Sequence, residues 1–234
     1  MIRRGNRRVG AAWLVVLPLL AASCSSPPPP DPYCSSTPLP ADLKVQSGQG
    51  ALQVDGTTPV QFLVFDLARK PVGNRLLGGT VAVKPGKYQV KVNNTVHAVT
   101  IEGGKLTRCA TGTLLVTGAT DDAWFVQELS GAALEQTRLG KPLSLMPGTF
   151  RVKVNSTLTT AEVKLNRVTE LKTGSLVVEG SGDGYQVTDK AGALLEYKQM
   201  DRALSLFPGE YNVEMGENTR AARIEAGRET RVKF

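Results

Sequence analysis

The sequence predicts an all-β protein: three tandem small antiparallel β-sandwich repeats after a signal peptide and a Pro-rich tether. The composition supports this fold class, because 24 glycines, 14 prolines and 6% aromatic residues suit many short strands joined by turns. A Pro-Gly turn followed by apolar residues at alternate positions is typical of a strand with one buried face. This motif occurs three times, as Pro85-Gly86-Lys87-Tyr88-Gln89-Val90, Pro147-Gly148-Thr149-Phe150-Arg151-Val152 and Pro208-Gly209-Glu210-Tyr211-Asn212-Val213.

Residues 1–23 have the pattern of a secretory signal peptide. Four arginines precede an apolar run from Val9 to Leu20, and small residues follow it. The twelve residues of this run cover roughly 18 Å of a hydrocarbon layer that is roughly 30 Å thick. The run Leu20-Ala21-Ala22-Ser23-Cys24 resembles the lipobox of bacterial lipoproteins, which implies that Cys24 is lipidated and becomes the first mature residue. The alternative is an ordinary signal peptide with an incidental Cys24.

Lipidation of Cys24 would anchor the chain to a membrane without spanning it, because acyl chains contribute about 0.8 kcal/mol per buried methylene. We therefore expect a bacterial cell-envelope protein that faces the periplasm or the cell exterior. In enterobacterial lipoproteins an Asp after the lipidated cysteine is tied to inner-membrane retention. The chain has Ser25 there, so it resembles cargo for the outer membrane if the cell has one.

Residues 24–49 are predicted to be the lipidated cysteine and a linker. Seven of the 14 prolines lie in residues 25–40. Proline at this density favours an extended polyproline II conformation, at about 3.1 Å per residue. The segment could then hold the repeats up to roughly 50 Å from a membrane.

Three repeats are expected at residues 50–111, 112–173 and 174–234. Their opening strands are offset by 62 residues, and the same aromatic-x-Val-x-acid pattern follows in each. A unit of roughly 60 residues buries only about 60% of its unfolded surface, so contacts between neighbours are expected to stabilise it. The pattern places these residues in register: Phe62, Val64 and Asp66; Trp124, Val126 and Glu128; Tyr185, Val187 and Asp189.

The repeats resemble the PEGA and carboxypeptidase-regulatory-like families, which are small transthyretin-like sandwiches of bacterial envelope proteins. The resemblance covers residues 50–234 and rests on the opening Gly-x-Leu-x-Val, the Pro-Gly-x-aromatic-x-Val motif and the closing strand. The tetrapeptide that gives PEGA its name is absent. The resemblance implies an accessory role as a spacer, an adhesive module or an attachment to other machinery.

Cys34 and Cys109 remain after Cys24 is assigned to lipidation. An even number of cysteines in an exported protein indicates a disulfide, which would fasten the tether to the end of the first repeat. The alternative is that Cys109 is a small buried apolar residue, because it aligns with Leu171 and Val232 in the closing strands.

The remaining candidate residues favour structural roles. His97 is the only histidine, so one chain cannot assemble a Ser-His-Asp relay or a histidine metal cluster, and strand alternation predicts that it faces solvent. The aligned acids Asp66, Glu128 and Asp189 are expected to bond turn amides. Trp124 is expected in a core, with a stacking platform for sugar or peptide as the alternative. No phosphate loop or dinucleotide fingerprint is present, so no cofactor, metal or catalytic residue is predicted.

The net charge does not indicate a nucleic-acid partner. Of 28 basic residues, four lie in the predicted signal peptide, which leaves 24 against 21 acidic residues, or about +3. Together the features predict a non-catalytic envelope lipoprotein that acts as a spacer or scaffold, with the membrane and an envelope protein or glycan as partners. The alternative function is a carbohydrate- or peptide-binding surface module, because sandwich edges can accept an added strand.

Overall fold

The structure is a computed structural model that describes residues 31–200 and 202–234. The predicted signal peptide, Cys24 and the first prolines of the predicted linker lie outside the described residues. The described residues form strands and turns, and a search of them finds no apolar helix of membrane-spanning length. The predicted all-β fold class is confirmed.

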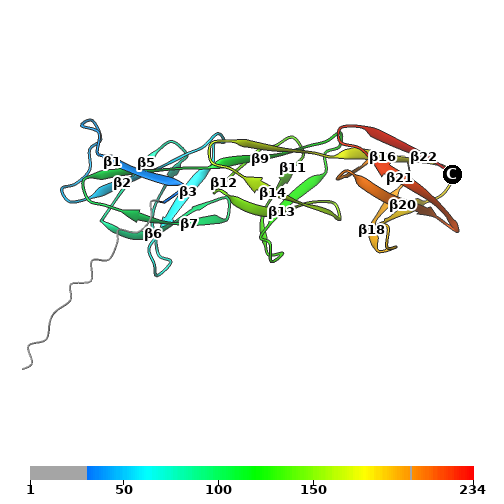
Figure 1. The fold of residues 1–234 in the computed structure, drawn as a ribbon, viewed down its shortest axis with the longest axis horizontal. Coiled ribbons are helices and arrows are strands. Elements are labelled where there is room, and N and C mark those ends of the chain that lie inside the picture. The colour runs from blue at the N-terminus through cyan, green and yellow to red at the C-terminus, as the bar shows by residue number, and fades with distance from the viewer. Residues whose placement is uncertain (1–30, 201) are drawn as a thin grey trace, which may run out of the picture. The chain divides into compact units, whose positions relative to one another are not determined.

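Each repeat contains seven strands (Figure 1). Those of the first repeat are β2(Gly50–Asp55), β3(Gln61–Phe65), β4(Pro71–Leu76), β5(Thr80–Val83), β6(Gly86–Val92), β7(Thr95–Ile101) and β8(Lys105–Ala110). Those of the second are β9(Gly112–Thr117), β10(Ala123–Gln127), β11(Ala133–Arg138), β12(Leu143–Leu145), β13(Gly148–Val154), β14(Thr157–Val163) and β15(Val168–Lys172). Those of the third are β16(Gly174–Glu179), β17(Gly184–Thr188), β18(Leu194–Gln199), β19(Leu204–Leu206), β20(Gly209–Met215), β21(Asn218–Ile224) and β22(Glu229–Lys233).

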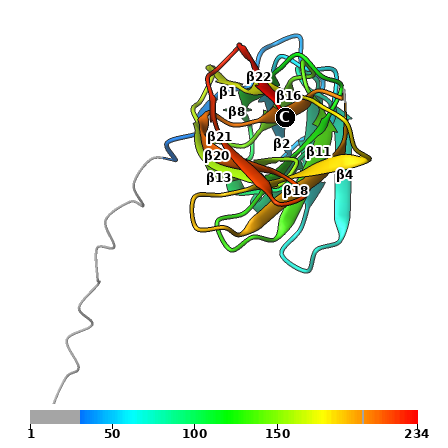
Figure 2. The ribbon, with the colours of Figure 1, turned by 90° about the vertical axis from the view of Figure 1, so that its right-hand side faces the viewer.

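The strands of each repeat form two layers with the same topology. One layer is a four-stranded antiparallel sheet, ordered β4-β3-β6-β7, β11-β10-β13-β14 or β18-β17-β20-β21. In the other, the opening strand lies between the short strand before the Pro-Gly turn and the closing strand, as in β12-β9-β15. Figure 2 shows the third repeat end on, with β16 and β22 above β18.

One strand pair in each repeat is parallel, which the prediction of antiparallel sandwiches did not include. The opening and closing strands pair this way: β2 with β8, β9 with β15, and β16 with β22. The chain leaves the four-stranded sheet after its last strand and crosses to the other layer, so the closing strand runs in the same direction as the opening one.

Local sequence explains the strand phases and their turns. In β13, Phe150, Val152 and Val154 are buried while the residues between them are half-exposed, as the period of two requires. The turn between β6 and β7 contains Asn93 and Asn94, both with positive φ. Two such residues suit the type I′ turn of a two-residue hairpin.

The linker prediction is wrong for residues 34–38. These residues form β1(Cys34–Pro38), which pairs antiparallel with β8 and adds a fourth strand to that sheet. The physical reason is that Cys34-Ser35-Ser36-Thr37 lies between prolines and retains backbone N–H groups. An extended segment of this kind can satisfy the open edge of β8, and Pro38 stands at the end of an edge strand, where it is tolerated.

Each repeat has its own apolar core. Phe62, Trp124 and Tyr185 occupy the aligned position of the three repeats and are almost fully buried. Two further residues cross the repeat boundaries. Met146 precedes the second Pro-Gly turn but packs in the first core, and Phe207 precedes the third but packs in the second core. The second and third repeats thus each complete the core of the one before them.

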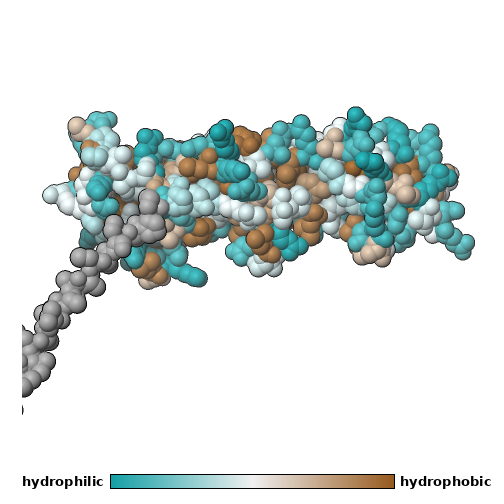
Figure 3. Space-filling view, viewed as in Figure 1, coloured by the Kyte–Doolittle hydropathy of each residue, from teal (hydrophilic) through white to brown (hydrophobic). Residues whose placement is uncertain are grey.

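The surface drawn in Figure 3 alternates between polar and apolar areas. Small brown patches are separated by teal and white surface over the described part of the chain. Scattered apolar residues of this kind are ordinary on protein surfaces.

Candidate functional site

A disulfide joins the segment before the first repeat to that repeat's closing strand. The pairing of β1 with β8 places Cys34 directly opposite Cys109, with their Cα atoms 4.1 Å apart, and the two sulfur atoms are bonded. Cys109 is also 1% exposed, so it is both a disulfide partner and a buried residue. The bond closes a separation of 75 residues.

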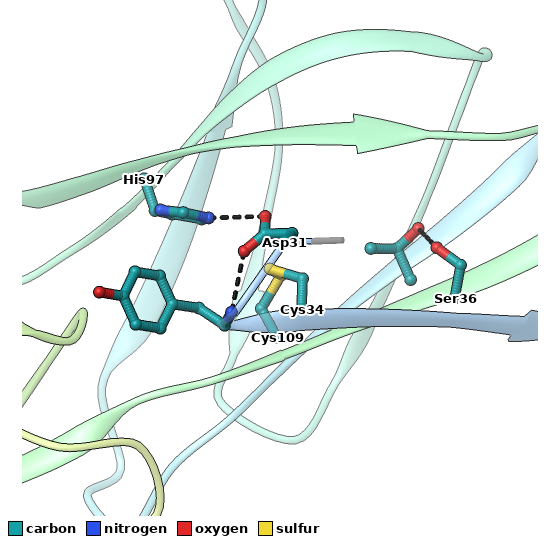
Figure 4. The surroundings of a disulfide bond; sticks show 7 residues. Asp31, Cys34, Ser36, His97 and Cys109 are labelled. Carbon is teal, nitrogen blue, oxygen red and sulfur yellow. Dashed lines mark hydrogen bonds and ion pairs between the residues drawn. A yellow bond between two sulfur atoms is a disulfide. The ribbon is translucent and has the colours of Figure 1, made fainter. Parts of the chain in front are cut away.

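A polar contact lies beside the disulfide (Figure 4). His97 Nε2 lies 2.8 Å from the Asp31 Oδ2, and the Tyr33 N–H donates to Asp31 Oδ1 at 2.9 Å. The Tyr33 ring meets the His97 ring edge-on, with centroids 5.2 Å apart. We call Asp31, Tyr33, Cys34, His97 and Cys109 the clasp, because they hold residues 31–34 against the first repeat.

The prediction that His97 faces solvent is wrong. Its side chain is only 20% exposed. His97 lies in phase with the buried Thr95 and Val99, whereas Val96 and Ala98 are exposed, so the phase of β7 is the reverse of the predicted one. Asp31 and Tyr33 pack against the His97 ring. The sequence pattern of β7 contains no information about a segment 66 residues earlier.

The clasp also brings together three residue types that ligate metals. Side-chain donor atoms of Asp31, Cys34 and His97 lie within 4.8 Å of one another. Metals bind cysteine as the thiolate, however, and the Cys34 sulfur is bonded to Cys109. In this oxidised form the cluster is therefore a structural fastening.

The other predicted residues have structural roles in the described chain. Asp66 Oδ1 accepts the Lys70 N–H at 2.8 Å, and Asp189 Oδ1 accepts the Ala191 N–H at 2.8 Å, which confirms that these acids bond turn amides. In the second repeat, Glu128 Oε2 instead accepts the Ser130 hydroxyl at 3.1 Å.

Trp124 cannot act as a stacking platform. The residue is 0% exposed, and its Nε1–H donates to the Arg138 carbonyl at 2.9 Å. A platform needs an aromatic face open to solvent, and strand alternation turns this face into the second core. Trp124 therefore has a core role, and the alternative prediction that it binds a ligand is wrong.

A polar network links the first repeat to the second. Thr58 Oγ1 donates to Ser144 Oγ at 2.7 Å, and Asn93 Nδ2 donates to the Ser144 carbonyl at 3.0 Å. The Met146 N–H donates to Thr95 Oγ1 at 2.8 Å. Ser144 is 0% exposed, so these bonds compensate for burying its polar groups.

The same network recurs between the second and third repeats. Thr120 Oγ1 lies 2.6 Å from Ser205 Oγ, and Asn155 Nδ2 donates to the Ser205 carbonyl at 2.7 Å. The Phe207 N–H donates to Thr157 Oγ1 at 3.1 Å. The two junctions thus use residues at aligned positions of successive repeats.

The aligned positions change where no junction forms in the described chain. The first repeat has Ala82 and Lys84 in place of the serine and the inserted apolar residue, and both are exposed. The third has Gly216 and Asn218 in place of the asparagine donor and the threonine acceptor. The polar set therefore belongs to the junctions rather than to the fold of a single repeat.

Sequence reasoning missed the junction residues. The sequence did contain a signal. The threonine and asparagine of the first repeat recur in the second, and the serine of the second recurs in the third, at nearly the same offset. Acids, histidine and cysteine are the residues that commonly mark a chemical site in a sequence, whereas the residues of the junctions are uncharged threonine, asparagine and serine.

Asp122 adds a charge to the second junction. Its carboxylate accepts bonds from Thr120 Oγ1 at 2.7 Å and from the Asn155 Nδ2 and Ser205 N–H at 3.2 Å each. Burial raises the pKa of Asp122, but these bonds and the positive charge of Lys198 outweigh burial, so its pKa lies below the ordinary value of 3.8. Since Asp122 already accepts the Thr120 hydroxyl proton, Ser205 is the donor to Thr120.

Comparisons with known proteins give distant structural similarity. No protein-family model matches the chain, and no curated protein matches its sequence. The resemblance to the PEGA and carboxypeptidase-regulatory-like families therefore stays a prediction.

Three solved structures are similar to the chain at low identity. The TIE protein of Bacillus anthracis is 13% identical, with 80% of this chain and 50% of that chain covered and a TM-score of 0.24. The minor pilin GBS52 of Streptococcus agalactiae is 11% identical (53% and 94% covered, TM-score 0.22). The major pilin subunit BcpA of Bacillus cereus is 10% identical (80% and 98% covered, TM-score 0.22). The chain spans about half the length of the TIE protein.

Removing the disulfide should destabilise the first repeat selectively. Replacing both cysteines, Cys34→Ala and Cys109→Ala, should lower the free energy of unfolding of that repeat by about 2–4 kcal/mol, because the open chain gains conformational entropy. Urea titration with hydrogen exchange of β8 amides measures this. The buried Trp124 reports the second repeat by fluorescence, and its unfolding should move less. Equal loss in both repeats would contradict a local fastening.

Acid should loosen the second junction before the first. The folded pKa of Asp122 is lowered, so its carboxylate stabilises the junction above the ordinary value of 3.8 and loses that effect as the pH falls through the lowered pKa. Below pH 3.8, we expect faster hydrogen exchange at Ser205 than at Ser144, whose junction has Val60 in place of the acid.

The matched variants separate this effect from general acid unfolding. Asp122→Asn should remove the pH dependence at Ser205, whereas Asp121→Asn should leave it, because Asp121 is 79% exposed and pairs with Arg138. If Ser144 and Ser205 respond alike to acid, the carboxylate is not responsible.

Proposed function

We propose that this chain is a non-catalytic cell-envelope lipoprotein whose three repeats form a jointed spacer and scaffold. The observation that carries the proposal is the repeated junction, in which an apolar side chain and a set of directed hydrogen bonds cross from one repeat to the next. Modules joined only by flexible linkers need no such residues.

Both parts of the junction oppose bending. Separating the second and third repeats would expose Phe207, which is 5% exposed, and would leave the buried polar groups of Ser205 without protein partners. The apolar insertion supplies free energy, and the hydrogen bonds restrict the orientation. A partner bound to one repeat would then be held at a fixed distance from the others.

The clasp brings the repeats closer to the proposed anchor than a free linker would. Asp31 is seven residues after Cys24, and an extended chain spans at most about 3.3–3.6 Å per residue, or roughly 25 Å. The sequence-based value of roughly 50 Å assumed that residues 25–40 were all free. The clasp therefore favours a repeat array that starts near the membrane surface.

The functional groups of the described chain favour a non-catalytic role. The single histidine is paired with Asp31 within the clasp, and the aligned acids of the first and third repeats accept bonds from their own turns. These interactions occupy the side chains that a hydrolytic site would need.

The anchor predicts a change in location. Replacing Cys24→Ser should release the protein from the membrane fraction into the soluble envelope fraction and prevent incorporation of labelled palmitate. The control Ser25→Ala keeps the cysteine and should remain in membranes. Membrane association of the Cys24→Ser protein would refute the lipid anchor.

The junction predicts a fixed distance between repeats. Spin labels at the exposed positions Leu129 and Leu194, in a soluble Cys24→Ser chain, should give one narrow distance distribution in pulsed electron spin resonance. Phe207→Ala should widen it, because the insertion is lost. Lys84→Ala alters the aligned residue of the first repeat, which no preceding described repeat contacts, and should have no effect. A broad distribution before substitution would contradict the spacer.

A further inference from the structure

The first repeat differs from the others in how the edge of its smaller sheet is covered. In the first, β1 lies beside the closing strand β8, in the order β1-β8-β2-β5. In the second and third repeats, the closing strands β15 and β22 are the last strands of their sheets within the described chain. The same topology thus has one covered edge and two open ones.

The backbone of β15 is oriented to receive a strand. The Thr113 N–H donates to the Arg167 carbonyl, and the Thr173 N–H donates to the Thr117 carbonyl, so odd-numbered residues around β15 face β9. Successive residues of a strand direct their backbone groups to opposite sides. The residues whose N–H and C=O groups face the open side are Val168, Glu170 and Lys172.

The pairing of β1 with β8 shows how an added strand hydrogen-bonds to the edge of a closing strand. The Leu39 N–H donates to the Gly104 carbonyl in the same register, so Ser35 and Thr37 are the residues of β1 that exchange hydrogen bonds with β8. Their partners Arg108 and Leu106 align with Glu170 and Val168 of β15. The two closing strands therefore present equivalent donors and acceptors.

Side-chain exposure also marks the edge of β15 as uncovered. Leu106 is 6% exposed in the first repeat, whereas the aligned Val168 is 62% exposed in the second. Thr107 is 2% exposed, and its hydroxyl lies 3.1 Å from that of Ser36. The aligned Thr169 is half-buried and donates to the Glu162 carbonyl instead. Apolar surface that β1 and its flanking residues cover in one repeat is left in solvent in the other.

The edge of β22 is less suited to an added strand. Glu229 takes the position of Val168, and Arg231 bonds both Glu179 and Glu229 at 2.6 Å. Lys233 pairs with Glu179 at 3.0 Å. Charged side chains of this kind protect edge strands against pairing. In β15, the ion pair of Lys172 with Glu170 is longer, at 3.7 Å, and Thr117 takes the position of Glu179.

A cleft continues from the carboxyl end of β15. It has a volume of about 560 Å³ and lies between the second and third repeats, where Glu170, Lys172, Arg228 and Glu229 line it. In the first repeat, Asp31–Ser35 lie along the aligned region and help to line a hollow there. A strand added to β15 in the same direction as β1 would thus have space for the residues that precede it.

We propose that the open edge of β15 binds an extended segment of a partner polypeptide, antiparallel to β15 and in the register that β1 takes on β8. This goes beyond the spacer function, because it assigns one repeat a ligand site. The register sets the chemistry of the segment: a small apolar residue opposite Leu171, a hydroxyl residue opposite Thr169 and a basic residue opposite Glu170.

The probe can be built from the chain's own covering strand. A synthetic peptide of residues 31–40 that carries Cys34→Ala and Ser35→Lys places alanine opposite Leu171 and lysine opposite Glu170. Added to the soluble Cys24→Ser chain with its disulfide intact, it should shift the NMR signals of β15 and slow hydrogen exchange at Val168, Glu170 and Lys172. The β1 strand of the chain keeps the edge of β8 occupied.

Backbone methylation of the peptide tests the pairing without altering the protein. Methylation of the nitrogens of residues 35 and 37 should abolish binding, because those N–H groups face β15. Methylation of the residue 36 nitrogen is the matched control and should leave binding largely intact. Equal loss from both peptides would overturn strand addition.

Charge reversal tests the register. Glu170→Arg should weaken binding of the lysine peptide by roughly fivefold, since exposed ion pairs and repulsions contribute about 1 kcal/mol or less each. A peptide with Ser35→Glu should regain that loss. The control Glu217→Arg changes an exposed acid of the third repeat that does not line the cleft, and it should leave the affinity within roughly twofold.

Three outcomes would overturn the proposal. One is the absence of β15 signal shifts at millimolar peptide. Another is protection that maps to β22 instead of β15. The last is concentration-dependent protection of β15 without peptide, because it would assign the edge to a second copy of the chain.

Discussion

The insertion of one apolar residue into the neighbouring core is the interaction on which the array depends. A sandwich of roughly 60 residues buries too little surface to be more than marginally stable alone. Met146 and Phe207 extend the first and second cores with side chains from the following repeat. Because each stands directly before a Pro-Gly turn, the motif that enters β13 and β20 also sets where the neighbour is contacted. Fold and assembly of the repeats therefore share one structural element.

Hydrogen bonds give these contacts a direction that apolar burial lacks. Ser144 and Ser205 are fully buried and accept bonds from the asparagine of the preceding hairpin turn. Such buried polar groups are costly when unpaired, so each junction favours a single arrangement. The second junction adds the Asp122 carboxylate, which accepts bonds from Thr120, Asn155 and Ser205 and whose pKa these bonds lower. The two junctions thus share their geometry but differ in charge.

Edge coverage is where the repeats differ most in chemistry. The three repeats share one topology but differ at the edge of the smaller sheet. In the first repeat, β1 covers β8 and the disulfide fastens it there. In the third repeat β22 carries a network of charges, and in the second β15 has an exposed valine and a neighbouring cleft. Open strand edges are a hazard that proteins usually cover or charge. Two of the three edges are therefore protected against an added strand, and the edge of β15 is not. A repeated fold can acquire a specific binding site in this way without a change of topology.

The sequence by itself determined the features that depend on neighbouring residues. Strand alternation is local, so the repeat, the phase of strands such as β13 and the burial of Trp124 followed from spacing alone. β7 has apolar residues in both phases, so spacing did not determine which side of it is buried. The tertiary structure decided which distant segments meet. In the tertiary structure, the first and last strands of each repeat pair in parallel, and Asp31 contacts His97. Residues 34–38 form a strand instead of a linker, and Phe207 packs in the core of the preceding repeat. These contacts join residues far apart in the chain, and a period of two along one strand contains no information about the strand beside it.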